Sequence, residues 1–229
     1  MISHEHKCIF VHIPKTAGTS INTFFHPDVT FLHAKPDYKR LFGWCPKRKL
    51  HMQHATAKQL LETELITQEQ WDTYFKFTFV RNPWDRAYSD YLWLMKDRKI
   101  KDSFSNYIQK AGLFSEVLNY SNQIDYRGDH LMSQIEFLTI NGVIDIDFIG
   151  RFENFGQDIL TINQNLGIVK KFNVHDKKNT KRFKHYSFFY NDVNKKLVET
   201  KFKNDIKKLN YEFENKTDFA LNLKKIFIK

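Results

Sequence analysis

Three short apolar runs interrupt the polar background of this chain. Branched and aromatic residues dominate residues 7–13, 76–80 and 144–152, and proline or polar residues bound each run. This pattern is typical of buried strands. A weaker run at residues 29–33 predicts a further short strand, whereas residues 37–50 are basic and irregular and predict a surface loop.

Stretches with helical spacing follow the apolar runs. Helices are predicted at residues 16–25, 55–62, 68–74, 153–166 and 191–209, from Asn82 onward, and as short pieces between 103 and 138. Thr67 and Gln70 have the spacing of a capping box, and Gly167 is a helix-stop signal. Two helices show an inner apolar face, made of Trp84, Tyr88, Tyr91 or Leu92, and Met95 in one and of Leu197, Val198, Phe202 and Ile206 in the other.

The order of these elements predicts the fold class. A strand followed by a helix, repeated along the chain, favours a parallel sheet with helices on both faces, which is an α/β fold. Ligands of such sheets bind where the strands end. Lys15 and Arg81 each follow a predicted strand closely, so we expect both at the same rim of the sheet.

Composition and charge narrow the class of protein. Apolar residues make up 41% of the 229 residues, which is enough for one globular domain, predicted at residues 1–213. Residues 214–229 are a basic amphipathic tail that packs on the domain, mediates dimerisation or touches a membrane surface. The formal charge of +10 favours an anionic partner. Cys8 and Cys45 lack the spacing of a disulfide framework or a zinc site.

The start of the chain carries no long apolar run. Neither a signal peptide nor a transmembrane segment is therefore expected. The location predicted from this pattern is cytoplasmic, or peripheral at a membrane surface.

The first candidate binding motif lies between the first strand and the first helix. It consists of Pro14, Lys15, Thr16, Ala17, Gly18, Thr19 and Ser20. Such a turn gathers backbone N–H groups, hydroxyls and an ammonium at a helix N-terminus, which suits an oxyanion. It is not a Walker A loop, because Lys15 precedes the glycine of the motif. The alternative interpretation is a polar turn with a solvated lysine.

The second candidate motif follows the second strong strand. Arg81 stands at the strand end, and Ser89 lies eight positions later on the following helix. A guanidinium and a hydroxyl held by rigid elements suit a phosphate monoester. The alternative is an arginine paired with Asp85 and a serine on a solvated helix face.

Together, the two motifs resemble the PAPS-dependent sulfotransferases, where PAPS is 3′-phosphoadenosine 5′-phosphosulfate. The segments IPKTAGTS, RNPWDRAYSDY and IGRFENFGQDIL look most like the carbohydrate branch, which includes heparan-uronyl 2-O- and chondroitin sulfotransferases and small bacterial members. The resemblance implies a P-loop-NTPase-like sheet, with the motif at Lys15 holding the 5′-phosphosulfate. It also implies that Arg81 and Ser89 hold the 3′-phosphate.

The same resemblance suggests a general base and a loop over the substrates. A histidine that precedes the arginine strand acts as base in the uronyl branch, which points to His54, with His51 as a second candidate. A basic loop at the corresponding stage implies nucleotide contacts from Asn179, Thr180 and Lys181. Candidates for acceptor contacts are His51, Arg86, Arg182 and Lys184. A surface histidine and a solvated charge run remain the alternative interpretations.

The predicted reaction is in-line transfer of a sulfuryl group from PAPS to a carbohydrate hydroxyl, with 3′,5′-ADP as product and no metal. The expected partner is a glycan or glycolipid, acidic given the basic charge, and no nucleic acid, because no nucleic-acid motif is present. Two alternatives stay open. One is a phosphotransferase that uses ATP and Mg²⁺, and the other is a basic module that binds polyanions without catalysis.

Overall fold

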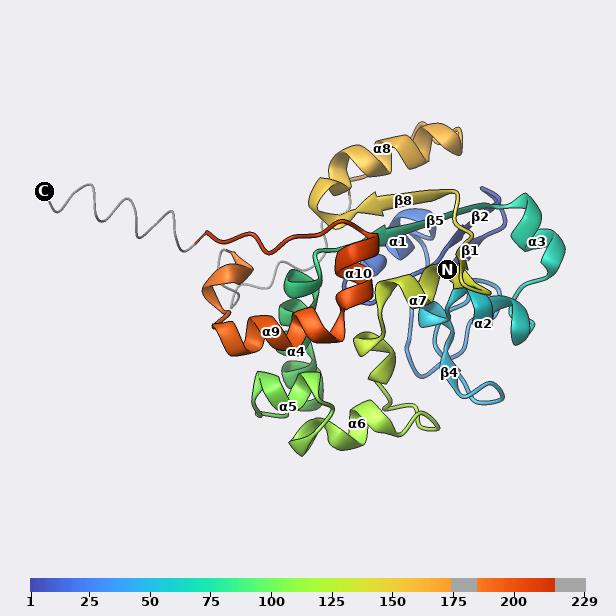
Figure 1. The fold of residues 1–229 in the computed structure, drawn as a ribbon. Coiled ribbons are helices and arrows are strands. Elements are labelled where there is room, and N and C mark those ends of the chain that lie inside the picture. Colours follow the sequence, from blue (N-terminus) through green and yellow to red (C-terminus); the bar gives the residue numbers. More distant parts are fainter. Residues whose placement is uncertain (174–184, 217–229) are drawn as a thin grey trace, which may run out of the picture. The chain divides into compact units, whose positions relative to one another are not determined.

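The computed structural model describes residues 1–173 and 185–216 of the chain (Figure 1). Their contacts divide the chain into two compact units. Unit 1 comprises Met1–Arg81 and Ser115–Lys177, and unit 2 comprises Asn82–Phe114 and Lys178–Lys229. The prediction of a single domain over residues 1–213 is not tested by this division.

Unit 1 is built on a four-stranded sheet with the order β1-β2-β5-β8. The strands are β1 (Ile2–Ser3), β2 (Cys8–Phe10), β5 (Phe75–Val80) and β8 (Phe148–Arg151). β2, β5 and β8 run parallel, and β1 pairs antiparallel with β2. The protein is therefore a mixed α/β structure with a parallel core, and each of the three strongest apolar runs overlaps one of its parallel strands.

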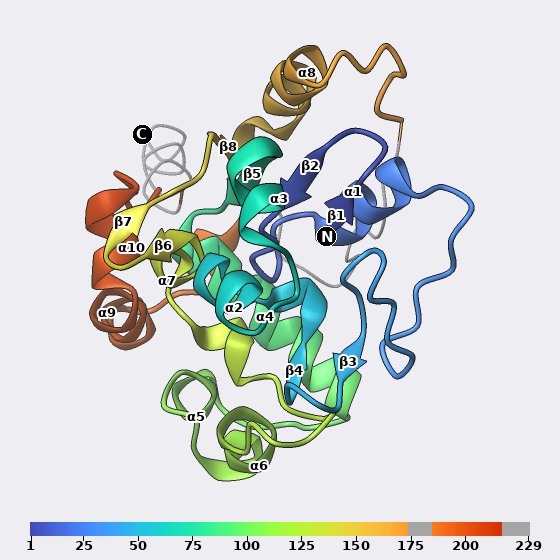
Figure 2. The ribbon, with the colours of Figure 1, turned by 90° about the vertical axis from the view of Figure 1, so that its right-hand side faces the viewer.

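One face of the sheet forms the main core of unit 1. Successive side chains of a strand point to opposite faces, so alternate apolar residues of β2 and β5 share this face. They pack against helices α1 (Gly18–Phe25) and α8 (Phe155–Asn165), and Figures 1 and 2 show α8 running beside β8. The buried residues of the cluster are Met1, Cys8, Phe10, Ile21, Phe24, Phe25, Phe77, Phe79, Ile159 and Ile162. Helices thus hold the strand ends at which the site forms.

The other face of β5 carries Lys76, whose side chain is only 7% exposed. Its ammonium donates to the Trp71 carbonyl of helix α3 (Gln68–Thr73) at 3.1 Å and lies 3.3 Å from the Asp147 carboxylate. A buried lysine needs such partners because desolvation penalises its charge. The predicted capping box of α3 is confirmed, since the Thr67 side chain accepts from the Gln70 N–H and the Gln70 side chain accepts from the Thr67 N–H.

The remaining elements of unit 1 are short. They are β3 (Trp44–Cys45) paired with β4 (Leu50–His51), the 3₁₀ turns Met52–His54, Gly128–Leu131 and Phe152–Asn154, the helices α2 (Ala57–Glu62), α6 (Ser115–Asn119) and α7 (Gln134–Leu138), and the hairpin of β6 (Thr139–Ile140) and β7 (Val143–Ile144). Several of these turns carry the polar residues of the candidate site.

All regular elements among the described residues of unit 2 are helical. Its elements are α4 (Pro83–Arg98), α5 (Phe104–Ile108), a 3₁₀ turn at Gly112–Phe114, a second 3₁₀ turn at Tyr186–Phe188, α9 (Asp192–Lys201) and α10 (Lys203–Lys208). The Asn82 side chain caps α4 by accepting from the Trp84 N–H at 3.1 Å, and Pro83 occupies the first turn as predicted. Inside the unit, the Tyr107 hydroxyl donates to the buried Asp90 carboxylate at 2.7 Å.

Some local predictions are wrong. Residues 29–33 form no strand; Phe31 instead packs its ring on Phe42, with ring centroids 4.6 Å apart. Residues 37–50 are not a surface loop, because apolar residues in it are buried and form β3. The predicted helix 191–209 is interrupted at Phe202, where the backbone leaves helical geometry and the ring is buried. The run 144–152 likewise divides between β7 and β8.

No helix among the described residues is long and apolar enough to cross a membrane.

Candidate active site

The predicted binding motif, residues 14–20, connects β2 to α1 and is called the anion loop below. Lys15 and Ala17 both have a positive φ, 72° and 70°, on either side of the buried Thr16. The Thr16 hydroxyl donates to the Ile13 carbonyl at 2.7 Å and ties the turn to the strand end. Alternation of left-handed residues curves the backbone so that N–H groups can converge on an anion.

The loop ends at the N-terminus of α1. Ala17 is the residue that precedes the helix, and its methyl side chain cannot cap the first N–H groups. These donors and the helix dipole favour an anion at this point. Lys15 is partly exposed and Thr19 is exposed, so an ammonium and a hydroxyl border the same turn.

Gly18 makes room for a histidine ring. A Cβ atom at this position would lie 1.9 Å from Nε2 of His12, far inside any allowed contact. The His12 ring cannot yield easily, because it is 8% exposed and stacks on Phe10 with centroids 5.2 Å apart. The glycine of the anion loop is thus required by close packing, in addition to any role in the turn.

Arg81 reaches the anion loop from the end of β5. Its guanidinium donates to the Lys15 carbonyl at 2.9 Å and lies 4.0 Å from the centre of the Phe152 ring. The prediction that Lys15 and Arg81 share one rim of the sheet is therefore confirmed. The predicted contact of Arg81 with a 3′-phosphate is not tested by this geometry.

A single side chain fixes the backbone of Arg81. The Gln134 amide of α7 accepts from the Arg81 N–H at 2.9 Å and donates to the Arg81 carbonyl at 2.8 Å. Gln134 is fully buried, so both bonds form away from water and hold the strand end firmly.

His54 lies beside the strand that enters the anion loop. Its Nδ1 is 3.4 Å from the His12 carbonyl oxygen, and the two ring centroids are 4.6 Å apart. His54 ends a 3₁₀ turn, and the chain after it is fixed by a capping box in which Thr56 and Gln59 bond each other at 3.1 Å and 3.0 Å. The structure thus brings the predicted base to the predicted anion site.

The surroundings keep His54 neutral. Burial lowers its pKa well below the ordinary value, and the neighbouring rings of His12, His130 and His51 lower it further. The pKa of His12 is also well below the ordinary value, and burial is again the main cause. A neutral imidazole carries the lone pair that a general base needs.

The second candidate for the base is His51, whose Nε2 atom already has hydrogen-bond partners within the protein. Nε2 lies 2.9 Å from the Arg127 guanidinium and 2.9 Å from the Ile124 carbonyl oxygen. Burial, followed by the charge of Arg127, lowers the pKa of His51 to about 3. Of the two candidates, the geometry favours His54 as base and a structural role for His51.

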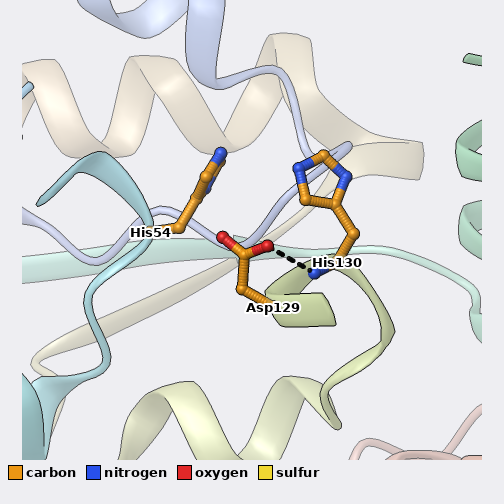
Figure 3. A group of neighbouring side chains, drawn as sticks. All are labelled: His54, Asp129 and His130. Carbon is orange, nitrogen blue, oxygen red and sulfur yellow. Dashed lines mark hydrogen bonds between the residues drawn. The ribbon is translucent and has the colours of Figure 1, made fainter. Parts of the chain in front are cut away.

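Two residues near His54 were missed by the sequence reasoning. Asp129 and His130 lie on the 3₁₀ turn Gly128–Leu131, and both are buried. Figure 3 shows the Asp129 carboxylate between the rings of His54 and His130, whose centroids are 5.2 Å apart. The only signal in the sequence was a Gly-Asp-His triplet in a region without regular periodicity.

The side chains of His54, Asp129 and His130 offer the donor atoms that a divalent cation uses. One such atom from each residue lies within 4.8 Å of the others. Two atoms bound to one zinc ion cannot be further apart than about 4.2 Å, twice the usual bond length. Separations of up to 4.8 Å do not define a metal site, and the absence of a metal stays a prediction.

Three other groups of predicted site residues remain untested. Ser89 is partly exposed on α4 and belongs to unit 2. Arg86 is 2% exposed, with its guanidinium 5.7 Å from the Phe202 ring centre, a position that favours a structural role. Five residues of the basic loop lie outside the described residues, namely Asn179, Thr180, Lys181, Arg182 and Lys184.

Comparison with known proteins decides the family. A model described as the sulfotransferase family matches residues 1–219, nearly the whole chain. This chain belongs to the sulfotransferase family. The mixed α/β architecture of this sulfotransferase, with parallel strands flanked by helices, agrees with that assignment.

The relatives of this sulfotransferase add little beyond the family. An uncharacterized protein of Archaeoglobus fulgidus is 24% identical over 110 residues, which are 48% of this chain and 81% of the relative. No solved structure gives a significant match. The family match makes the protein a transferase of sulfuryl groups.

Proposed function

We propose that this sulfotransferase moves the sulfuryl group of PAPS to a hydroxyl of a carbohydrate. The observation that supports the proposal best is the meeting of three predicted parts in unit 1: the anion loop, Arg81 bonded to the Lys15 carbonyl, and His54 beside His12. These three parts are far apart in the sequence but close together in the fold. A site for sulfuryl transfer needs an anion-binding loop and a base next to each other.

The anion loop is proposed to bind the phosphosulfate, with the sheet serving as a P-loop-NTPase-like platform. Its curved backbone and the start of α1 supply N–H donors, and Lys15 supplies a positive charge. Charge grows on the phosphate oxygen that leaves sulfur, so donors aimed at this oxygen stabilise the transition state more than the ground state. Arg81 is proposed to bind the 3′-phosphate and keep sulfur in line, whereas the part predicted for Ser89 in this contact stays untested.

His54 is proposed to take the proton of the acceptor hydroxyl. The hydroxyl oxygen attacks sulfur, the bond between sulfur and the phosphate oxygen breaks, and 3′,5′-ADP leaves. A positioned base contributes about 10²- to 10⁴-fold to such a step. His54 suits this role because burial and its neighbours hold the imidazole neutral.

The acceptor is proposed to be an acidic glycan or glycolipid. The formal charge of +10 is the observation in favour, because a basic surface raises the local concentration of an anionic chain. The position that is sulfated depends on contacts of the acceptor, for which Arg182 and Lys184 remain the candidates, since the geometry favours structural roles for His51 and Arg86.

The test uses PAPS labelled with ³⁵S and a panel of acidic and neutral glycans. We expect label in an acidic glycan and a rise in melting temperature with 3′,5′-ADP but not with ATP and Mg²⁺. His54→Gln should lower turnover at saturating PAPS by about 10²-fold or more. The matched control is His4→Gln, since His4 is exposed and bonds only the Tyr74 hydroxyl at 3.1 Å among its described contacts.

Two results would contradict the proposal. Stabilisation by ATP and Mg²⁺ alone would indicate a phosphotransferase. Wild-type turnover in His54→Gln would remove the base assignment while leaving the donor assignment intact.

A further inference from the structure

The environment of His54 poses a problem for a general base. The groups that face it are the rings of His12 at the end of β2, His51 of β4 and His130, together with the Asp129 carboxylate. Burial makes a new positive charge on His54 costly, and a proton on any neighbouring imidazole would add charge repulsion. A base that cannot accept the charge of a proton is a weak base, so the site needs a compensating negative group.

Asp129 is placed to be this group. A carboxylate oxygen of Asp129 and a ring nitrogen of His54 lie within 4.8 Å of each other, and both also lie within 4.8 Å of a ring nitrogen of His130. Oδ1 accepts from the His130 backbone N–H at 3.1 Å, which fixes the direction of the carboxylate. In Figure 3 the other oxygen is on the side of the His54 ring.

The backbone beneath Asp129 is also anchored. The Arg127 N–H donates to the Val117 carbonyl at 2.7 Å, and the His130 N–H donates to the Arg127 carbonyl at 3.1 Å. Asp129 is only 9% exposed, so water screens its charge weakly. A fixed and weakly screened carboxylate acts strongly on a ring at this distance.

We infer that Asp129 is a positioning residue of this sulfotransferase, whose carboxylate stabilises the imidazolium that His54 becomes when it takes the acceptor proton. The inference rests on the proposed function. In the step itself, the O–H proton moves to His54, the acceptor oxygen bonds sulfur, and the pair of electrons of the broken S–O bond leaves with 3′,5′-ADP. Asp129 remains ionised throughout and gains no proton.

The effect on rate follows from the distance. An opposite charge within about 4–6 Å raises the pKa of a base by about 1 to 3 units. For a general base, about half of a change in pKa appears as a change in the logarithm of the rate. Loss of the Asp129 charge should therefore lower kcat about 3- to 30-fold.

The decisive variant is Asp129→Asn. Asparagine keeps the shape and the oxygen that accepts from the His130 N–H, while it removes the charge. We expect kcat to fall about 3- to 30-fold and the acid limb of the pH–rate profile to move to lower pH, since His54 becomes harder to protonate. Asp129→Glu should restore part of the rate. Asp125→Asn, which removes an exposed carboxylate four residues earlier, is the control and should keep the wild-type profile.

Histidine NMR gives a readout that does not require turnover. The ring signals of His54, assigned with His54→Gln, should titrate at a lower pH in Asp129→Asn than in the wild type. Equal His54 pKa values in the two proteins would overturn the inference. A fall of kcat by the same factor at every pH would also overturn it, because that is the mark of a merely structural role. If NMR shows the coupling but no glycan accepts sulfate, the proposed function fails and the electrostatic pairing stands.

Discussion

Replacing Gly18 by alanine tests whether the anion loop depends on the His12 ring behind it. The added methyl group would start 1.9 Å from Nε2, 2.1 Å from Cε1 and 2.4 Å from Cδ2 of that ring. Non-bonded atoms prefer about 3.5–4.0 Å, so ring and helix must separate by about 1.5 Å or more. The ring has little room, since it packs between Phe10 and His54.

The expected cost can be estimated from two opposing effects. Overpacking of a filled interior costs about 1–3 kcal/mol. Alanine gains up to about 1 kcal/mol over glycine within a helix, and less at the first helical residue, where Gly18 stands. The Gly18→Ala protein should therefore lose about 1–2 kcal/mol, which for a chain of this size lowers the melting temperature by about 2–8 °C.

The chain offers a matched control in Gly156→Ala. Gly156 lies in the first turn of α8, and a Cβ there would meet no atom within 4 Å. This variant should be as stable as the wild type or up to about 1 kcal/mol more stable. Thermal unfolding and calorimetric titration with 3′,5′-ADP compare the two variants. If Gly18→Ala matched Gly156→Ala in both measurements, the packing argument for the glycine would be refuted.

Three further predictions concern the rim, unit 2 and acid stability. Lys15→Ala should nearly abolish transfer, whereas Arg81→Ala should mainly weaken binding of 3′,5′-ADP, by about 10-fold or more, because it removes a charged partner; kinetics and calorimetry separate the two. Tyr107→Phe should cost about 1–3 kcal/mol in urea denaturation, because the buried Asp90 carboxylate loses its 2.7 Å donor, and an unchanged midpoint would contradict this. The folded pKa of His51 is lowered to about 3, so the unfolded chain binds its proton first as the pH falls below about 6.5. Stability should then decrease by about 1.4 kcal/mol per pH unit for this group, and His51→Gln should flatten the curve between pH 6 and pH 4.

The three parallel strands and helix α4 of this sulfotransferase were predictable because each has a clear local sequence pattern. The run that became β5 is dominated by phenylalanine and valine, with Lys76 and Thr78 between them, and the pattern around Pro83 marks the start of α4 before any tertiary contact is considered. The position of Lys15 and Arg81 at one rim was also predictable from topology, because the carboxyl ends of parallel strands lie at the same edge of a sheet. Lys15 and Arg81 meet for this reason.

The region of residues 29–50 shows where local sequence is insufficient. Its charges suggested a solvated loop, but Leu41 and Cys45 are among the most buried residues of the unit. Long basic side chains keep their charge in water while their neighbours turn inward, so the density of lysine and arginine says little about burial of the residues between them.

The histidine cluster could not be predicted for a different reason. His54 was proposed from family resemblance, whereas Asp129 and His130 have no periodicity or spacing that relates them to it. The turn that carries them is anchored to α6 through the Val117 carbonyl and brings them to His54. Chemistry that depends on contacts between distant turns is invisible until the fold is known.

The amide of Gln134 replaces a piece of backbone. A glutamine amide contains the same donor and acceptor as a peptide group, and here it pairs with both polar atoms of Arg81 in the way a neighbouring strand would. A whole strand at this place would extend past the end of β5 and cover the rim. One side chain pairs both backbone atoms of Arg81 without adding a strand to the sheet. Glutamate, although the same size, has no donor to offer the Arg81 carbonyl, and the difference of one atom decides whether this substitute for a strand can form.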